Sequence, residues 1–71
     1  MKYAVAYLSL FVGELKIDFV EAESELAATR LYLAKEGWKW GYDTVSTVEE
    51  LYGIVFDCDC WIRATLVTDS M

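Results

Sequence analysis

The sequence contains neither histidine nor proline, and it has only two cysteines among its 71 residues. Without histidine the chain lacks the commonest general base and metal ligand, and a Ser-His-Asp triad cannot form within it. The four glycines stand apart from one another and make no phosphate-binding loop. Two cysteines do not form a disulfide framework, so a reducing, cytoplasmic setting is expected. We therefore expect a protein that is not an enzyme and that uses no cofactor.

Basic residues are also scarce, with 6 Lys and Arg against 12 Asp and Glu, for a net charge of −6. This balance argues against direct binding to nucleic acid, because that binding needs cations to displace counterions from phosphates. It argues equally against anionic membrane surfaces. The apolar run from Tyr3 to Val12 is ten residues long, which is too short to span a bilayer, and no cleavage site of a secretory signal follows it. The favoured partner is another protein, with a basic surface.

Apolar residues, by contrast, are plentiful, at 56% of the chain, and 15% of the residues are aromatic. We expect a single domain over residues 1–71. A domain of this size buries only about 60% of the surface that its unfolded chain exposes, so some apolar surface should remain uncovered. That surplus favours a binding face or a homodimer, formed through an edge strand or through the sheet face that carries the tyrosines.

The densest group of strand-forming residues is Lys2 to Val20, which predicts a β-hairpin. The first strand, Lys2–Phe11, is apolar on both faces and is therefore expected at the centre of a sheet. We expect a helix against Ala4 and Ala6, whose small side chains allow close approach, and an unpartnered opposite face that carries Tyr3 and Tyr7. Gly13 supplies the turn. The strand from Glu14 to Val20 then alternates polar and apolar residues, as expected of a half-buried outer strand.

Two helices are predicted after the hairpin. Ser24 is a suitable N-cap and Gly37 a suitable stop for a helix over residues 24–36. Its predicted buried arc consists of residues at helical spacing: Leu26, Ala27, Leu31, Ala34 and Trp38. A capping box over residues 46–49 predicts a second helix of one or two turns that ends at Gly53.

The last segment, Ile54–Thr68, is predicted as a strand with a bend near residues 57–59. The order is then ββα(α)β. The fold class is α+β: a small antiparallel three-stranded sheet with one main helix on one face and a short second helix. The first strand should lie between the second and the last.

Cys58 and Cys60 form the one metal-like pair in the sequence. Zinc is usually held by four ligands, and this chain offers no second pair and no histidine. On a strand, residues two apart point the same way, so both thiols are expected in the apolar core and no metal site is predicted. A small thiol or metal protein that uses this pair is the alternative hypothesis.

Other residues are candidates for partner contacts. Asp57 and Asp59 would lie about 7 Å apart on the polar face of the last strand, and this spacing also allows an acidic nucleic-acid mimic that occupies a basic cleft. Trp40 and Tyr42 belong to an aromatic segment typical of binding hot spots. The complete set of predicted contact residues is Trp40, Tyr42, Asp57, Asp59, Trp61, Tyr3 and Tyr7.

The first part of the chain, over residues 3–11, 14–17 and 20–25, resembles small uncharacterised accessory proteins of phages. The resemblance covers the first half only and transfers no functional residue. It implies an early or accessory phage protein in the host cytoplasm that binds and inhibits a host or defence protein. Together with the composition, it gives the functional hypothesis: a non-enzymatic protein-binding module, of the kind that inhibits or modulates another protein.

Overall fold

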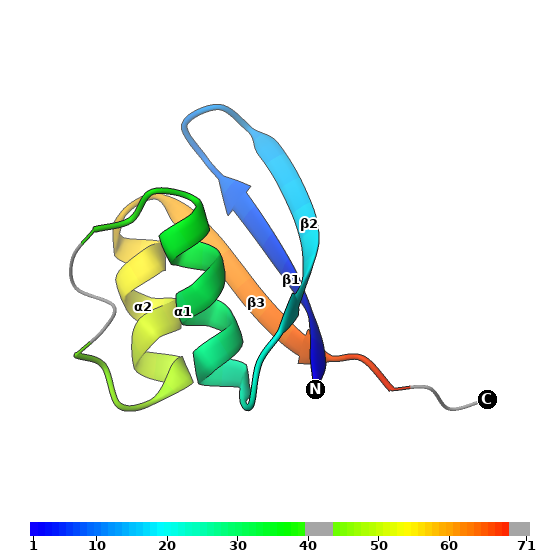
Figure 1. Cartoon of the computed structure of the whole chain (residues 1–71). Coiled ribbons are helices and arrows are strands. Elements are labelled where there is room, and N and C mark those ends of the chain that lie inside the picture. The colour runs from blue at the N-terminus through cyan, green and yellow to red at the C-terminus, as the bar shows by residue number, and fades with distance from the viewer. Residues whose placement is uncertain (40–43, 69–71) are drawn as a thin grey trace.

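The computed structural model describes residues 1–39 and 44–68, which form a three-stranded antiparallel sheet and two helices (Figure 1). In chain order the elements are β1 (Lys2–Ser9), β2 (Glu14–Glu21), α1 (Glu25–Lys35), α2 (Val48–Asp57) and β3 (Cys60–Leu66). The strand order is β2-β1-β3, with β1 in the middle. The predicted α+β class and the ββα(α)β order are confirmed.

The β1–β2 hairpin has a longer loop than predicted. Ser9 pairs with Glu14, so residues 10–13 form the loop and Phe11 lies in it rather than in β1. Gly13 has a φ of +67°, which glycine adopts at no steric cost, and its N–H donates to the Ser9 carbonyl at 2.8 Å. The loop extends beyond the helical layer in Figure 1.

Helix α1 begins and ends as predicted but buries a different arc. Its N-cap is Ser24, whose hydroxyl accepts the N–H of Ala27 at 3.1 Å. The buried residues of α1 are Ala28, Thr29, Tyr32 and Leu33. Leu31 and Ala34 are exposed, so the predicted arc is wrong there. Thr29 can be buried because its hydroxyl donates to the Glu25 carbonyl at 2.9 Å, which leaves no unpaired polar atom inside.

Helix α2 is longer than predicted. Thr47 is its N-cap and accepts the N–H of Glu50 at 3.2 Å. The helix then continues through Gly53 to Asp57, so the prediction of a strand from Ile54 is wrong up to Asp59. Leu51 and Val55 are four residues apart and both are fully buried, because they lie on one side of the helix and pack into the core. That burial outweighs the β preference of the apolar segment after Gly53.

Both helices cover the sheet face that carries Tyr3, Val5 and Tyr7, and all three of these side chains are buried. The tyrosine rings fill the space between sheet and helices, with the rings of Tyr7 and Tyr32 5.5 Å apart between centroids. The prediction that the tyrosine face lacks a partner within the chain is therefore wrong. The face that carries Ala4 and Ala6, predicted to lie under a helix, is the open one.

Candidate functional site on the open face of the sheet

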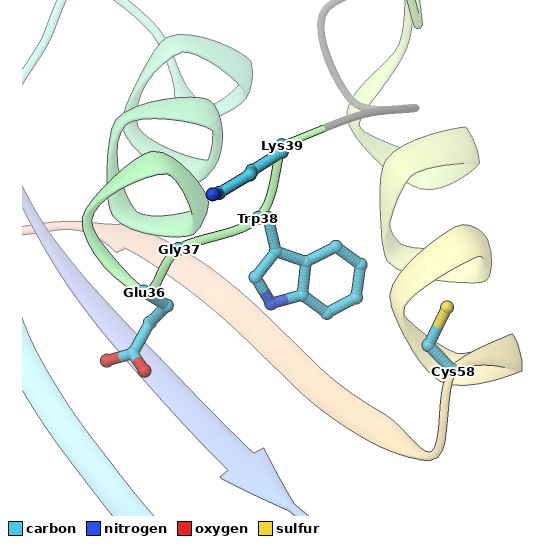
Figure 2. A pocket seen from close by; sticks show the side chains of 5 residues that line it. All are labelled: Glu36, Gly37, Trp38, Lys39 and Cys58. Carbon is cyan, nitrogen blue, oxygen red and sulfur yellow. The ribbon is translucent and has the colours of Figure 1, made fainter.

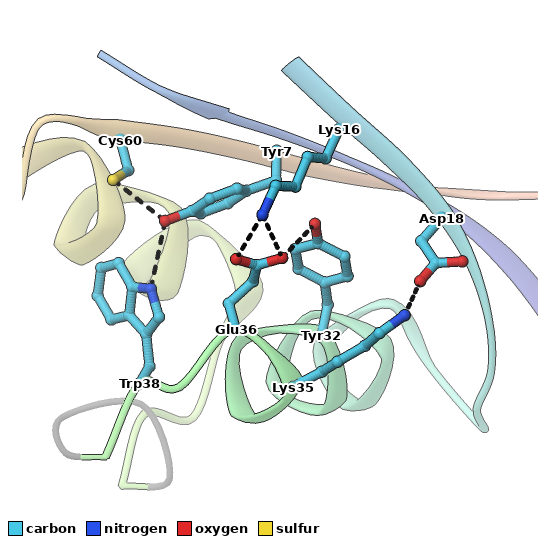
Figure 3. Close-up of polar contacts among 8 residues, drawn as sticks. All are labelled: Tyr7, Lys16, Asp18, Tyr32, Lys35, Glu36, Trp38 and Cys60. Carbon is cyan, nitrogen blue, oxygen red and sulfur yellow. Dashed lines mark hydrogen bonds and ion pairs between the residues drawn. The ribbon is translucent and has the colours of Figure 1, made fainter. Parts of the chain in front are cut away.

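Strand β2 turns its apolar side away from the helices. Leu15, Ile17 and Phe19 are exposed, Ile17 to 65%. The side chains between them point to the helical layer and pair with α1: Lys16 Nζ lies 3.2 Å from Glu36 Oε1, and Asp18 forms an ion pair with Lys35 (Figure 3). The alternation predicted from the sequence is present, but the polar side of the strand faces inward.

The strand register defines the rest of this surface. Leu15, Leu8 and Trp61 lie side by side across the sheet in one row, Ile17, Ala6 and Arg63 in the next, and Phe19, Ala4 and Thr65 in the third. We call these nine residues the open face. Leu8, Ala4, Ala6 and Trp61 are partly exposed, so the face is apolar from β2 across to the Trp61 end of β3.

The hairpin loop extends this apolar surface. Leu10, Phe11 and Val12, which we call the hairpin tip, are all exposed, and Phe11 reaches 78%. Hairpin loops are normally polar. Scattered exposed apolar side chains are ordinary, whereas a contiguous group of this kind indicates an interaction surface.

Two cations, one at the margin of the open face and one on it, lie on aromatic rings. Lys2 Nζ is 5.7 Å from the centroid of the Phe19 ring. The guanidinium of Arg63 is 5.0 Å from the Trp61 ring and 4.5 Å from the ring of Tyr52 on α2, so it folds around the outer edge of β3. These contacts hold one positive charge near each side of the face.

The two outer strands have partly closed edges. The N–H of Ala64 on β3 donates to the Tyr52 hydroxyl at 3.0 Å. On β2, the N–H of Phe19 donates to the carboxylate of Asp18 at 2.8 Å. Side chains thus occupy backbone donors that another strand would need for edge pairing. Edge pairing is thus hindered at one position on each outer strand.

Behind the sheet, the hydroxyl of Tyr7 connects β1 with β3 and with the segment that follows α1 (Figure 3). That hydroxyl donates to Cys60 Sγ at 3.2 Å and accepts the indole N–H of Trp38 at 3.3 Å. Burial raises the pKa of Tyr7. Burial, together with a hydrogen bond to Glu36, also raises the pKa of Tyr32. Both phenols remain protonated at neutral pH, so this group of side chains ties the layers together and offers no activated nucleophile.

The two cysteines do not share a strand face. Cys58 follows the last residue of α2 and is half-buried, whereas Cys60 begins β3 and is buried. The prediction that both thiols lie in the core holds for Cys60 alone. Cys58 lines a pocket of about 430 Å³ together with Glu36, Gly37, Trp38 and Lys39 (Figure 2). Within residues 1–39 and 44–68, no three Cys, Asp or Glu side chains gather in a way that could hold a metal ion.

The predicted contact residues that the structure describes lie in three different places. Tyr3 and Tyr7 are buried under the helices and cannot contact a partner. Asp57 ends α2, and Asp59 occupies the turn after it with a φ of +61°, so the predicted strand spacing of these carboxylates is wrong. Trp40 and Tyr42 lie outside the described residues. Trp61 alone belongs to the open face.

The sequence interpretation missed Leu15, Ile17 and Phe19 as site residues. One signal could have identified them. The hairpin has three apolar residues in its loop, at positions 10–12, directly before the apolar side of β2. A polar turn would be expected if the surface beside it faced water alone.

The fold and the open face together define a small α+β protein with two layers, in which the helices cover one side of the sheet and leave the other apolar and uncovered. Comparison with known proteins found no matching family model, no matching curated protein and no matching solved structure. Neither of the helices described has the length and apolar character needed to cross a membrane.

Proposed function

We propose that the protein is a non-enzymatic binding module that docks another protein on the open face and the hairpin tip. The observation that carries this proposal is the orientation of β2, which exposes Leu15, Ile17 and Phe19 while Lys16 and Asp18 face α1. An isolated domain gains nothing from this orientation. A partner that covers the face would make it favourable.

The energetic gain from such cover is large for so small a chain. Full burial of one Leu, Ile or Phe side chain is worth about 1.5–3 kcal/mol relative to exposure. Three such side chains on β2, joined by those of the hairpin tip, could offset much of the entropy lost on association. The aromatic and Arg side chains at the Trp61 end belong to the residue types enriched in binding hot spots.

The resemblance of the first half of the chain to small phage accessory proteins favours a host or defence protein as the partner, with inhibition or modulation as the outcome. The acidic nucleic-acid mimic has lost its geometric basis, because Asp57 belongs to a helix and Asp59 to a turn. The thiol hypothesis is likewise weakened, because Cys58 lies in the turn after α2, whereas Cys60 begins β3.

The proposal is tested by affinity capture from the native host cell with three tagged proteins: the wild type, Ile17→Glu and Leu31→Glu. Leu31 is the matched control, since it is an exposed apolar residue on α1, away from the open face. We expect a partner, identified by mass spectrometry, that is retained by the wild type and by Leu31→Glu and is lost by Ile17→Glu. Near-UV circular dichroism checks that all three proteins are folded. Equal recovery on all three would refute a role for the open face.

A further inference from the structure

The middle of the open face is a strip of small side chains. Ala4 lies between Phe19 and Thr65, and Ala6 lies between Ile17 and Arg63. In the first row, at the hairpin end of the face, Leu8 lies in the same position between Leu15 and Trp61. The guanidinium of Arg63 folds toward Tyr52 at the edge of β3. The Arg63 side chain therefore does not rise above Ala6 on the β3 side of the strip. The surface along β1 is therefore lower than the apolar side of β2 that borders it.

The width and length of this strip match those of a short α-helix. Strands β2 and β3 both neighbour β1, and two strand spacings separate them by about 10 Å. An α-helix with its side chains is about 10–12 Å in diameter. The distance along β1 from the row of Leu8 to that of Ala4 is about 13 Å, which corresponds to about nine residues of helix.

We propose that the occupant of the open face is an amphipathic α-helix of the partner protein, with acidic residues along both sides of its apolar stripe, which lies over Ala4 and Ala6 along β1. The inference rests on the proposed function and specifies the partner's element. A helix on this side would complete a three-layer arrangement with the sheet in the middle. It would bury the apolar side of β2 in the way that α1 and α2 bury the tyrosine face.

A second copy of this chain fits the open face less well. Stacked sheets keep their strands within about 30° of each other. In a symmetric dimer with the two open faces stacked, the two-fold axis runs either along the strands or across them. In both cases β1 lies over β1 of the other copy, because it is the middle strand of the sheet. The two alanine strips would face each other and leave a gap, whereas protein interiors are close-packed. A convex helix fills the space that a second strip leaves empty.

The charges favour acidic flanks on the helix. Lys2 lies against Phe19 on the β2 side, and Arg63 lies at the edge of β3 on the other side. The carboxylate of Glu21, which pairs with Lys2 in the register, lies 3.5 Å from the terminal amine of Met1. The face thus presents cations on both sides although the whole chain has a net charge of −6.

The test uses two synthetic peptides of about 18 residues that share one Leu and Ala stripe and differ only in carrying Glu or Lys along its sides. Peptide binding to the full chain is measured by fluorescence anisotropy, and the contacts are mapped by ¹⁵N chemical shifts. We expect the Glu peptide to bind about tenfold more tightly than the Lys peptide at low salt, with the difference shrinking as salt is added. The shifts should centre on β1 and β2. Equal binding of both peptides, or shifts confined to α1 and α2, would overturn the proposal.

A matched pair of substitutions tests the alanine strip itself. Ala6→Trp fills the strip and should weaken binding of the Glu peptide at least about tenfold. Ala34→Trp adds the same side chain to an exposed position of α1 and should leave binding unchanged. Undiminished binding by Ala6→Trp contradicts a helix over β1. If neither peptide binds and sedimentation shows a dimer that Ile17→Glu dissociates, a second copy is the occupant. If neither peptide binds to a monomer, the helix is excluded, and the cell capture with Ile17→Glu decides the proposed function separately.

Discussion

The hydroxyl of Tyr52 fastens the outer edge of β3 to the helical layer. It accepts the N–H of Ala64 at 3.0 Å and donates to Glu25 Oε2 at 2.7 Å. Tyr52→Phe removes both bonds and leaves the Ala64 donor without its partner. We expect the free energy of unfolding, measured in urea, to fall by about 1–3 kcal/mol.

Tyr32→Phe is the control for that substitution. The Tyr32 hydroxyl bonds to Glu36 at 2.9 Å, but Glu36 keeps Lys16 as a partner when the hydroxyl is removed. No polar group is then orphaned, and the expected loss is about 1 kcal/mol or less. A Tyr52→Phe protein as stable as Tyr32→Phe would show that the bond to Ala64 contributes little.

Burial of phenols at the interface between the layers governs how the protein responds to alkali. Desolvation raises the pKa values of Tyr7, Tyr32 and Tyr52 above the ordinary value of about 10. Above pH 10 the unfolded chain therefore releases protons that the folded chain still holds, and the free energy of unfolding decreases as the pH rises. Below pH 10 these groups contribute their full stabilisation.

Absorbance at 295 nm during alkaline titration checks this expectation. The folded protein should show a group of tyrosines that ionises well above pH 10 or only as the protein unfolds. The same chain in concentrated urea should show all its tyrosines near 10. Native-state ionisation of every tyrosine near pH 10, with the fold intact, would contradict the buried placement.

At the scale of whole elements, β2 and β3 each carry one isoleucine, and the two isoleucines differ in burial. Ile62 on β3 is fully buried beneath the helices, whereas Ile17 on β2 is 65% exposed on the open face. We expect Ile62→Ala to cost about 2–5 kcal/mol in the free energy of unfolding. Ile17→Ala should cost about 0.5 kcal/mol or less, because little packing is lost. Urea denaturation of both variants measures the difference, and equal losses would mean that Ile17 is covered in the isolated chain.

Local features of the sequence predict most of the elements. The apolar run of β1, the alternation of β2 and the glycine between them specify the hairpin, and the central place of β1 follows from its two apolar faces. Ser24 and Gly37 delimit α1 because capping depends on residues close in the chain. The end of α2 was not predictable in this way. Gly53 resembles a stop signal, yet the helix passes through it because Leu51 and Val55 pack together in the core.

Periodicity alone does not tell which face of a strand is covered. The pattern of β2 separates Leu15, Ile17 and Phe19 from Lys16 and Asp18, but the direction of each side depends on where α1 lies. Likewise, both faces of β1 are apolar. The tyrosine face lies under the helices because the large tyrosine rings fill the space between the sheet and the helical layer, which the alanine side chains would leave empty. Periodicity therefore could not identify the open face, and the apolar hairpin loop was the one local signal for it, whereas the tyrosine face was expected to be uncovered.

Across the whole molecule, most of the large exposed apolar side chains lie on the β1–β2 hairpin, and the exceptions on the helices are Leu31 and Phe56. Acidic side chains such as Glu49 and Glu50 are exposed on α2, whereas the open face carries Lys2, Arg63 and a contiguous set of apolar side chains. The start of α2 thus presents hydrated carboxylates to the surroundings. The sheet presents a surface whose exposure to water is costly.

That apolar surface predicts that the folded protein binds the dye ANS. Dye binding usually reports loosened cores, but here the open face offers an apolar surface in a fully packed molecule. The triple variant Leu15→Thr, Ile17→Thr and Phe19→Thr should lose most of the ANS fluorescence while it keeps the near-UV circular dichroism of the wild type, because threonine retains a high strand propensity. Leu31→Thr, on the outside of α1, should keep the fluorescence. A triple variant that still binds the dye would show that the dye site lies on other exposed apolar side chains, such as Phe11 or Phe56, and not on β2.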